Sequence, residues 1–350
     1  MQIVLGHERG VVLARMFLGF TACLAALFSQ QLYSQVQPVG KPESNWLYII
    51  DSNKNREQSQ ILVLDPEQGL IRKVFKTGHQ PDLAVSSDGK KLFVAHNLPS
   101  PEGGSSSGVL EVVDSVTGLV LSRVENPDRW LTPASFYTSK MALSHDGRWL
   151  FIFKMHATQQ DSTFYVSTFD TEAGTFLPER VALPGCVSGV LLPMTQREHL
   201  AVICSETRDV RFLTLNQAGG KSEAVMPPSF IADAREHGRF VGTGEWSGTQ
   251  APVVSPDRRT LYLGVGKLDS LTTGRPRLSQ VVALRSDTYE RVGAVATAPF
   301  SSLAISKDGA RIYTIEHDTA SVSVIDARQL KALTTIDGIG VTPTFAVLAP

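Results

Sequence analysis

The chain has 350 residues, of which 42% are hydrophobic and 19% are charged, a balance that is typical of a globular protein with a substantial core and excludes a disordered chain. Its 33 Lys and Arg residues against 34 Asp and Glu residues give a formal net charge of -1. Such a chain has no long-range field to attract nucleic acid or an anionic membrane surface, so nucleic-acid binding is disfavoured.

The N-terminus has the pattern of a secretory signal. Arg9 and Arg15 precede an apolar run at residues 16–28, which polar residues follow. The run is shorter than the roughly 20 residues that a permanent membrane helix needs. We therefore expect residues 1–34 to be a signal peptide with an approximate boundary, and residues 35–350 to be a single periplasmic domain without a membrane anchor. A short buried helix is the alternative.

A repeated unit follows along the chain. Each copy has an apolar strand, a turn of the Ser-x-Asp-Gly type and a second apolar strand that contains an aromatic residue. Glycine supplies the positive φ of a tight turn and aspartate caps it, so the turns are expected to be structural. The four copies are residues 83–94, 141–152, 252–263 and 303–314.

A third strand and a more polar fourth strand follow the repeated unit, as at residues 110–114 and 119–124. Four short antiparallel strands in each repeat of roughly 40–50 residues predict an all-β fold, a β-propeller. Six blades can be counted, and residues 344–348 are expected to join the blade that starts near Trp46 and so close the ring. A β-sandwich is the rival fold, but it would not repeat one element in one phase. A seventh blade would require a degenerate blade near residues 226–250.

Three cysteines are present, and Cys23 lies within the expected signal. Cys186 and Cys204 remain in the mature chain, and an even number in an exported protein favours a disulfide. Two buried free thiols are the alternative. Two cysteines without suitably spaced histidines do not predict a zinc site.

Alignment of the repeats on their turns brings polar residues into one column, at the end of the second strand. His96, Lys154 and Glu316 share this position, and Val265 is the apolar member. Equivalent positions in a ring point to one face, so these residues are candidates for a polar ligand or proton-transfer site at a mouth of the central channel. Solvated strand ends are the alternative. Insertions that could form a binding face or ordinary surface loops follow the column at residues 98–107, 157–162 and 268–277.

From about Trp46 to its C-terminus the chain resembles the heavy, β-propeller subunit of periplasmic quinoprotein amine dehydrogenases. The most specific part is Asp114 to Met155, above all residues 114–118, 133–147 and 150–153. Residues 340–345 resemble the family's final strand. The resemblance implies a seven-bladed propeller with a disulfide between Cys186 and Cys204. Two features depart from the family, because a blade is shortened near residues 226–250 and the polar N-terminal arm is nearly absent.

The resemblance also implies a function and partners. Such enzymes oxidise primary amines to aldehydes and ammonia and pass electrons to a periplasmic acceptor. Their cofactor, tryptophan tryptophylquinone, is formed on a separate cysteine-rich light subunit, so this chain would hold no catalytic residue. His79 stands where the family has an aromatic residue near the substrate channel. The alternatives are a stand-alone periplasmic binding propeller with Tyr-Val-Thr-Asn-type repeats and a propeller hydrolase or lactonase.

Overall fold

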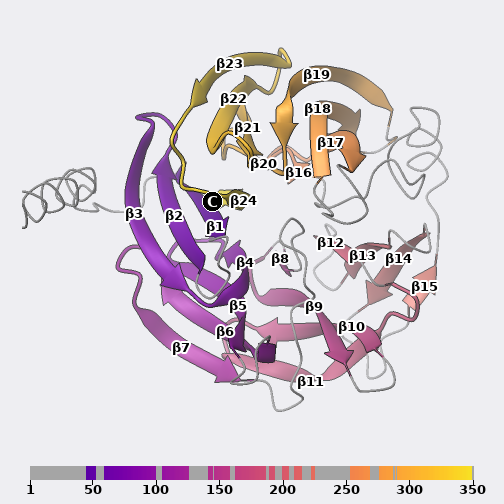
Figure 1. The fold of residues 1–350 in the computed structure, drawn as a ribbon. Coiled ribbons are helices and arrows are strands. Elements are labelled where there is room, and N and C mark those ends of the chain that lie inside the picture. The colour runs from indigo at the N-terminus through magenta and orange to yellow at the C-terminus, as the bar shows by residue number, and fades with distance from the viewer. Residues whose placement is uncertain are drawn as a thin grey trace, which may run out of the picture.

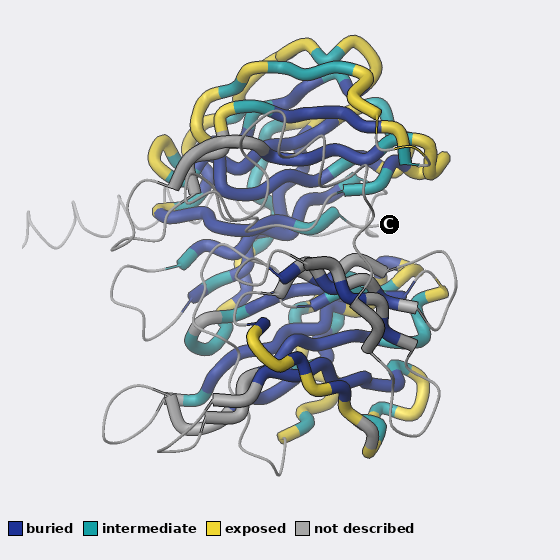
Figure 2. The backbone as a smooth tube through the Cα atoms, turned by 90° about the vertical axis from the view of Figure 1, so that its right-hand side faces the viewer, coloured by how far each residue is buried: buried dark blue, intermediate teal, exposed yellow. Residues whose placement is uncertain are grey.

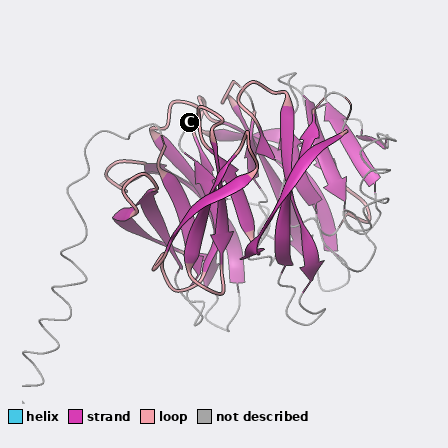
Figure 3. Cartoon of the chain, turned by 90° about the horizontal axis from the view of Figure 1, so that it is seen from above, coloured by secondary structure: helices cyan, strands magenta, loops and turns pink. Residues whose placement is uncertain are grey.

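The structure is a computed structural model that describes residues 45–52, 59–99, 105–125, 141–144, 146–157, 162–186, 189–193, 199–204, 209–214, 222–224, 253–268, 276–286, 288 and 290–348. Within these ranges the chain forms strands joined by turns and loops (Figure 3). None of the described segments is a helix long and apolar enough to cross a membrane.

The described strands assemble into antiparallel sheets of four strands each. The first sheet contains β24 (Pro343–Leu348), β1 (Leu47–Ser52), β2 (Ser59–Asp65) and β3 (Leu70–Thr77). The second contains β4 (His79–Val85), β5 (Lys91–Pro99), β6 (Ser105–Asp114) and β7 (Val120–Glu125). The third contains β8 (Met141–Leu143), β9 (Trp149–Ala157), β10 (Ser162–Asp170) and β11 (Thr175–Ala182).

Three further sheets come from the second half of the chain. The fourth contains β12 (Gly189–Pro193), β13 (His199–Cys204), β14 (Asp209–Thr214) and β15 (Ser222–Ala224). The fifth contains β16 (Val253–Val254), β17 (Thr260–Leu268), β18 (Pro276–Arg285) and β19 (Arg291–Phe300). The sixth contains β20 (Ser302–Ile305), β21 (Arg311–Glu316), β22 (Ser321–Asp326) and β23 (Lys331–Ile336).

The sheets stand around a common centre with their first strands innermost (Figure 1). Inner strands of neighbouring sheets contact each other, as β4 does with β8 and β20 with β24. The C-terminal strand β24 pairs antiparallel with β1, with Tyr48 opposite Val347, as the sequence predicted for residues 344–348. This all-β architecture supports the predicted β-propeller.

The core lies in layers between neighbouring sheets. Successive residues of a strand point to opposite faces of its sheet, so each sheet contributes side chains to the layers on both of its sides. Leu92 and Val94 pack against the first sheet, whereas Phe93 and Ala95 pack against the third. Buried positions therefore follow the inner strands, and the exposed positions gather on the outer strands and turns (Figure 2).

The repeated Ser-x-Asp turns have the structural role that the sequence predicted. In each of the four turns the serine hydroxyl donates to the aspartate at 2.6–2.7 Å and accepts the backbone amide that starts the second strand. Three turns place glycine at positive φ, at Gly89, Gly147 and Gly309. The turn between β16 and β17 places Arg258 at this position with a φ of 60°.

A second turn, between the third and fourth strands, lies beside the first. The aspartate that ends the third strand accepts two backbone amides of this turn, as Asp114 does from Val116 and Thr117. The next residue binds the first turn, since the Ser115 hydroxyl donates to the Gly89 carbonyl at 2.7 Å and Thr171 donates to that of Gly147 at 2.8 Å. Both kinds of turn therefore share one end of the sheets, named here the turn face, and the opposite end is the loop face.

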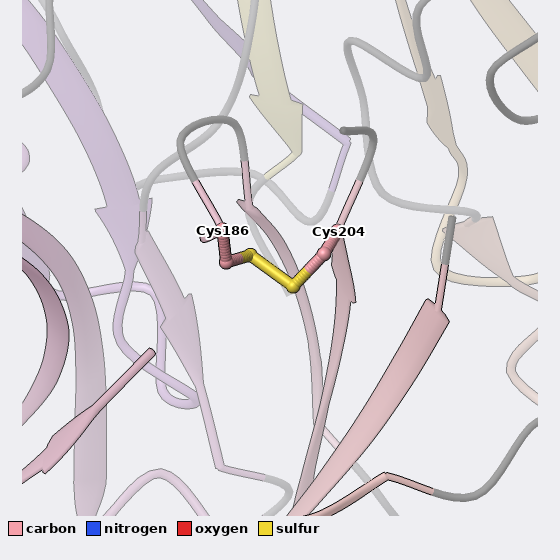
Figure 4. Close-up of a disulfide and its surroundings, with 2 residues drawn as sticks. All are labelled: Cys186 and Cys204. Carbon is pink, nitrogen blue, oxygen red and sulfur yellow. A yellow bond between two sulfur atoms is a disulfide. The ribbon is translucent and has the colours of Figure 1, made fainter. Parts of the chain in front are cut away.

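The predicted disulfide is present. Cys186, in the turn before β12, is bonded to Cys204 at the end of β13 with an S–S distance of 2.08 Å (Figure 4). Both cysteines are fully buried among apolar residues of the third and fourth sheets. The bond connects the segment that precedes the first strand of the fourth sheet to the second strand of that sheet.

Two sequence predictions fall outside the described residues. These are the signal peptide at residues 1–34 and the shortened blade near residues 226–250, which would lie between the fourth and fifth sheets. Both remain predictions, and so does the single-domain boundary at residue 35.

We expect Arg258→Gly to raise the free energy of unfolding by about 0.5–1 kcal/mol, because a side chain in the left-handed region costs about 1–2 kcal/mol. Urea unfolding of the two proteins would measure this. The matched control is Arg259→Gly at the next position, where φ is not positive and glycine should destabilise. Equal losses in both variants would contradict the strain at Arg258.

Replacement of both cysteines by alanine should lower the free energy of unfolding by about 3 kcal/mol, the chain-entropy value for a loop of this size. Denaturant titration in the absence of reductant measures the loss, and reduction of the wild-type protein should reproduce it. A thiol count of two on the unfolded, unreduced mature protein would show that the bond does not form.

Candidate functional site

The column predicted from the repeats lies at the loop face, where the second strands end. His96 is on β5, Lys154 on β9 and Glu316 on β21, and all three are buried. Val265 occupies the same place on β17, where it pairs with Gln280. Of the insertions after these positions, residues 100–104, 158–161 and 269–275 lie outside the described residues, so a binding face there remains a prediction.

His96 forms a buried pair with a residue that the sequence analysis did not select. Its Nε2 atom lies 3.3 Å from Oε2 of Glu111 on β6, and its Nδ1 atom lies 3.3 Å from the carbonyl oxygen of Asn97. Arg123 on β7 reaches the other carboxylate oxygen at 3.9 Å. The three side chains thus cross the second sheet from its second strand to its outer edge.

The hydrogen bond from His96 lowers the pKa of Glu111 below its ordinary value, with smaller help from the charges of His96 and Arg123 and against an opposing effect of burial. Glu111 is therefore a carboxylate at neutral pH. The pair can hold charge or exchange a proton at the loop face, and it can also simply stabilise the second sheet.

His79 lies next to this pair. It is the first residue of β4, is partly buried and pairs with Asn97 across the sheet. Gly78 alone connects β3 of the first sheet with β4 of the second, and a Cβ atom added there would lie 2.0 Å from Nδ1 of His96. The imidazole of His96 therefore rests directly on the backbone that joins the two sheets.

Lys154 occupies a different environment. Its side chain is fully buried, and Nζ lies 3.6 Å from the centre of the Phe176 ring, a close cation–π contact. Leu150 and Ile152, four and two residues earlier on the same face of β9, pack in the layer between the second and third sheets. Lys154 belongs to that layer.

Glu316 is bound by hydroxyl groups of its own sheet. The hydroxyls of Ser321 and Thr319 lie 2.8 Å and 3.2 Å from Oε2, and that of Ser323 donates to Oε1. By strand alternation Glu316 shares a face with Ile312, which packs between the fifth and sixth sheets.

The structure thus brings the candidate residues to one end of the sheets but into different layers. By strand alternation His96 lies between the first and second sheets, Lys154 between the second and third, and Glu316 between the fifth and sixth, while His79 stands at the start of β4, opposite Asn97. Their role as substrate-channel residues remains a prediction.

Glu111 and Arg123 could not be selected from the repeat pattern because they lie on the third and fourth strands, outside the aligned column. The cross-strand register that places Glu111 opposite Val94, on the same face as His96, brings them together. In the described ranges there is no group of three or more His, Cys, Asp or Glu residues that could hold a metal ion.

The described tryptophans lie in separate layers. Trp46 packs between the first two sheets, and Trp149 packs in the layer of the third and fourth sheets. Trp130 and Trp246 lie outside the described residues. The two described indoles are therefore not placed to be joined into a quinone cofactor.

Comparisons with known proteins agree with this architecture. No protein-family model matches the chain. A stretch of 139 residues is 26% identical to the methylamine dehydrogenase heavy chain of Methylophilus methylotrophus, covering 36% of this chain and 34% of that protein. The chain thus aligns with about a third of the length of this curated relative.

Several solved structures share the fold. The periplasmic gluconolactonase of Pseudomonas aeruginosa has a TM-score of 0.53 at 16% identity, covering 87% of this chain and 99% of that one. Hydrazine synthase of Kuenenia stuttgartiensis has a TM-score of 0.50 at 18% identity, covering 80% of each chain. A putative 6-phosphogluconolactonase of Bacteroides fragilis has a TM-score of 0.51 at 13% identity, covering 89% and 99%. At these identities the similarity concerns the fold alone, and the class that it supports is the β-propeller.

We expect Gly78→Ala to destabilise the protein by about 1–3 kcal/mol, because the added methyl group collides with the buried ring of His96. In the double variant Gly78→Ala/His96→Ala the collision is removed, so the two losses should not add. Chemical unfolding of both single variants and the double variant measures the coupling. Additive losses would mean that the ring and Gly78 do not touch.

Acid should weaken the pair of His96 and Glu111. Because the pKa of Glu111 is lower in the folded chain than its ordinary value of 4.5, its carboxylate stabilises the fold above that value. This contribution is lost as the pH falls through the lowered pKa. The unfolding free energy of wild type should therefore fall more steeply between about pH 5 and 3 than that of Glu111→Gln. Parallel curves would contradict the interaction.

Proposed function

We propose that the chain is the heavy-subunit-like propeller of a periplasmic amine dehydrogenase, an oxidoreductase that converts primary amines to aldehydes and ammonia. The similarity to the methylamine dehydrogenase heavy chain carries this proposal. In it the chain is a scaffold and channel wall and contributes no catalytic residue.

The proposal includes a partner and a cofactor. A small cysteine-rich light subunit would carry tryptophan tryptophylquinone, which supplies the oxidation of the amine, and a periplasmic acceptor would take up the electrons. This chain would orient the light subunit and would line the channel through which the amine reaches the cofactor.

The finer architecture belongs to the same proposal. We infer a ring of six blades, one for each described four-stranded sheet, in which β24 closes the ring by completing the first sheet. The pairing of β24 with β1 joins the two ends of the domain within one sheet, which hides an edge that would otherwise be free on each strand.

The decisive experiment is purification of the mature chain from the cells that produce it. A small, cysteine-rich exported chain with quinone absorbance should co-purify, and the complex should reduce a dye in the presence of a primary amine. Absence of both the partner and the amine oxidation would exclude the dehydrogenase and leave a stand-alone binding propeller as the function.

In an active complex, His96→Ala and Lys154→Ala should alter the KM for amine if the loop face lines the substrate route. The matched control is Lys90→Ala, whose side chain is exposed on the turn face. Equal kinetic constants in all three variants would restrict His96 and Lys154 to a structural role.

A further inference from the structure

The carboxylate of Glu316 has an unusual environment for a buried charge. The residue is 4% exposed, and three neutral hydroxyl groups, those of Thr319, Ser321 and Ser323, lie within hydrogen-bond distance of its oxygens. Thr319 and Ser321 also lie 2.6 Å apart, so one of these two hydroxyls donates to the other. Among the described residues no Lys, Arg or His nitrogen lies within ion-pair distance of it. A buried carboxylate without a compensating cation is costly, because neutral donors only partly replace its hydration.

Two other buried carboxylates in the described part of the chain have cationic partners, and a third accepts backbone amides. Asp65 has Arg72 at 2.7 Å, and Asp170 has Arg148 at 3.3 Å. Asp51 accepts two backbone amides, from Val341 and Thr342. The basic residue nearest in sequence to Glu316 is His317, which pairs instead with Asp318 at 3.3 Å. Glu316 is thus distinguished by a cage made of hydroxyl groups.

A second buried oxygen lies on the same face of the hairpin. Thr314 is fully buried, and its hydroxyl has no hydrogen-bond partner among the described residues. It pairs with Ser323 across the sheet, while Glu316 pairs with Ser321. Since residues two apart on a strand share a face, one carboxylate and three hydroxyl groups form a polar quartet there.

We propose that this quartet, together with Thr319, binds a small monovalent cation such as K⁺, Na⁺ or ammonium. Each hydroxyl that donates its proton to Glu316 keeps oxygen lone pairs that can face a cation. The single carboxylate matches a single positive charge, whereas Ca²⁺ sites usually collect more carboxylates in six to eight oxygen ligands. Thr319 is exposed at the loop face, so the cation can enter beside it. This site does not depend on the proposed amine dehydrogenase function.

Thermal unfolding of the full mature chain tests the site. KCl, NaCl or NH₄Cl is titrated while tetramethylammonium chloride, whose cation is too large for the cage, keeps the ionic strength constant. For wild type we expect Tm to rise with at least one small cation, by about 2 °C per tenfold concentration above its Kd. Glu316→Gln retains the side-chain size but removes the charge, so its Tm should not respond.

Two further variants make the result decisive. Glu290→Gln removes an exposed glutamate of the fifth sheet and should respond as wild type does. Ser323→Ala keeps the carboxylate and removes one oxygen, so it should require about tenfold more cation, even if Glu316→Gln fails to fold. A wild-type Tm that is indifferent to the cation, or an equal response in Glu316→Gln or Ser323→Ala, would overturn the site.

Discussion

The hydrogen bonds that join the two turns of a sheet are the constraint on which the rest of this architecture depends. In three of the described sheets a serine or threonine after the third strand donates its hydroxyl to a carbonyl of the first turn, as Ser115 does to Gly89 and Thr171 to Gly147. In the sixth sheet the backbone amide of Ala327 donates to the Ala310 carbonyl instead. All four strands of a sheet are thereby aligned at the turn face. Neighbouring sheets also meet there, since a Cβ atom at Gly147 would lie within 2.5 Å of Ser87. The loop face is free of this constraint and can vary from sheet to sheet.

Polar chemistry is consequently concentrated where the sheets end at the loop face. Inter-sheet layers are apolar along most of their length, and buried polar residues stand toward the loop-face end of three second strands. His96, Lys154 and Glu316 occupy this place, and each is compensated differently, by a carboxylate, an aromatic ring and a cage of hydroxyl groups. The same backbone position therefore holds an ion pair in one sheet, a cation–π contact in another and a candidate cation site in a third. The partners differ because the residues that face this position on the third and fourth strands differ from sheet to sheet.

This division bears on function. A scaffold that is held rigid at one face and diversified at the other can present a binding or channel surface without carrying the chemistry itself. Such a role agrees with the proposed heavy subunit, whose cofactor would belong to a partner. The same division could also serve a propeller of unrelated activity, because one fold can carry many functions and each function lies in a site built on the fold.

The amino-acid sequence alone determined the all-β class, the phase of the repeat, the structural role of the Ser-x-Asp turns, the pairing of the last strand with the first sheet and the bond between Cys186 and Cys204. These features depend on local hydrogen bonding and on residue types at fixed spacing, which a repeat makes visible. The tertiary structure decided which residues contact His96, Lys154 and Glu316. Glu111 meets His96 through cross-strand register, and Gly78 meets the same ring through the crossing between two sheets. Whether a buried charge has a partner depends on contacts between distant strands, and such contacts leave no signal in the spacing of residues along the chain.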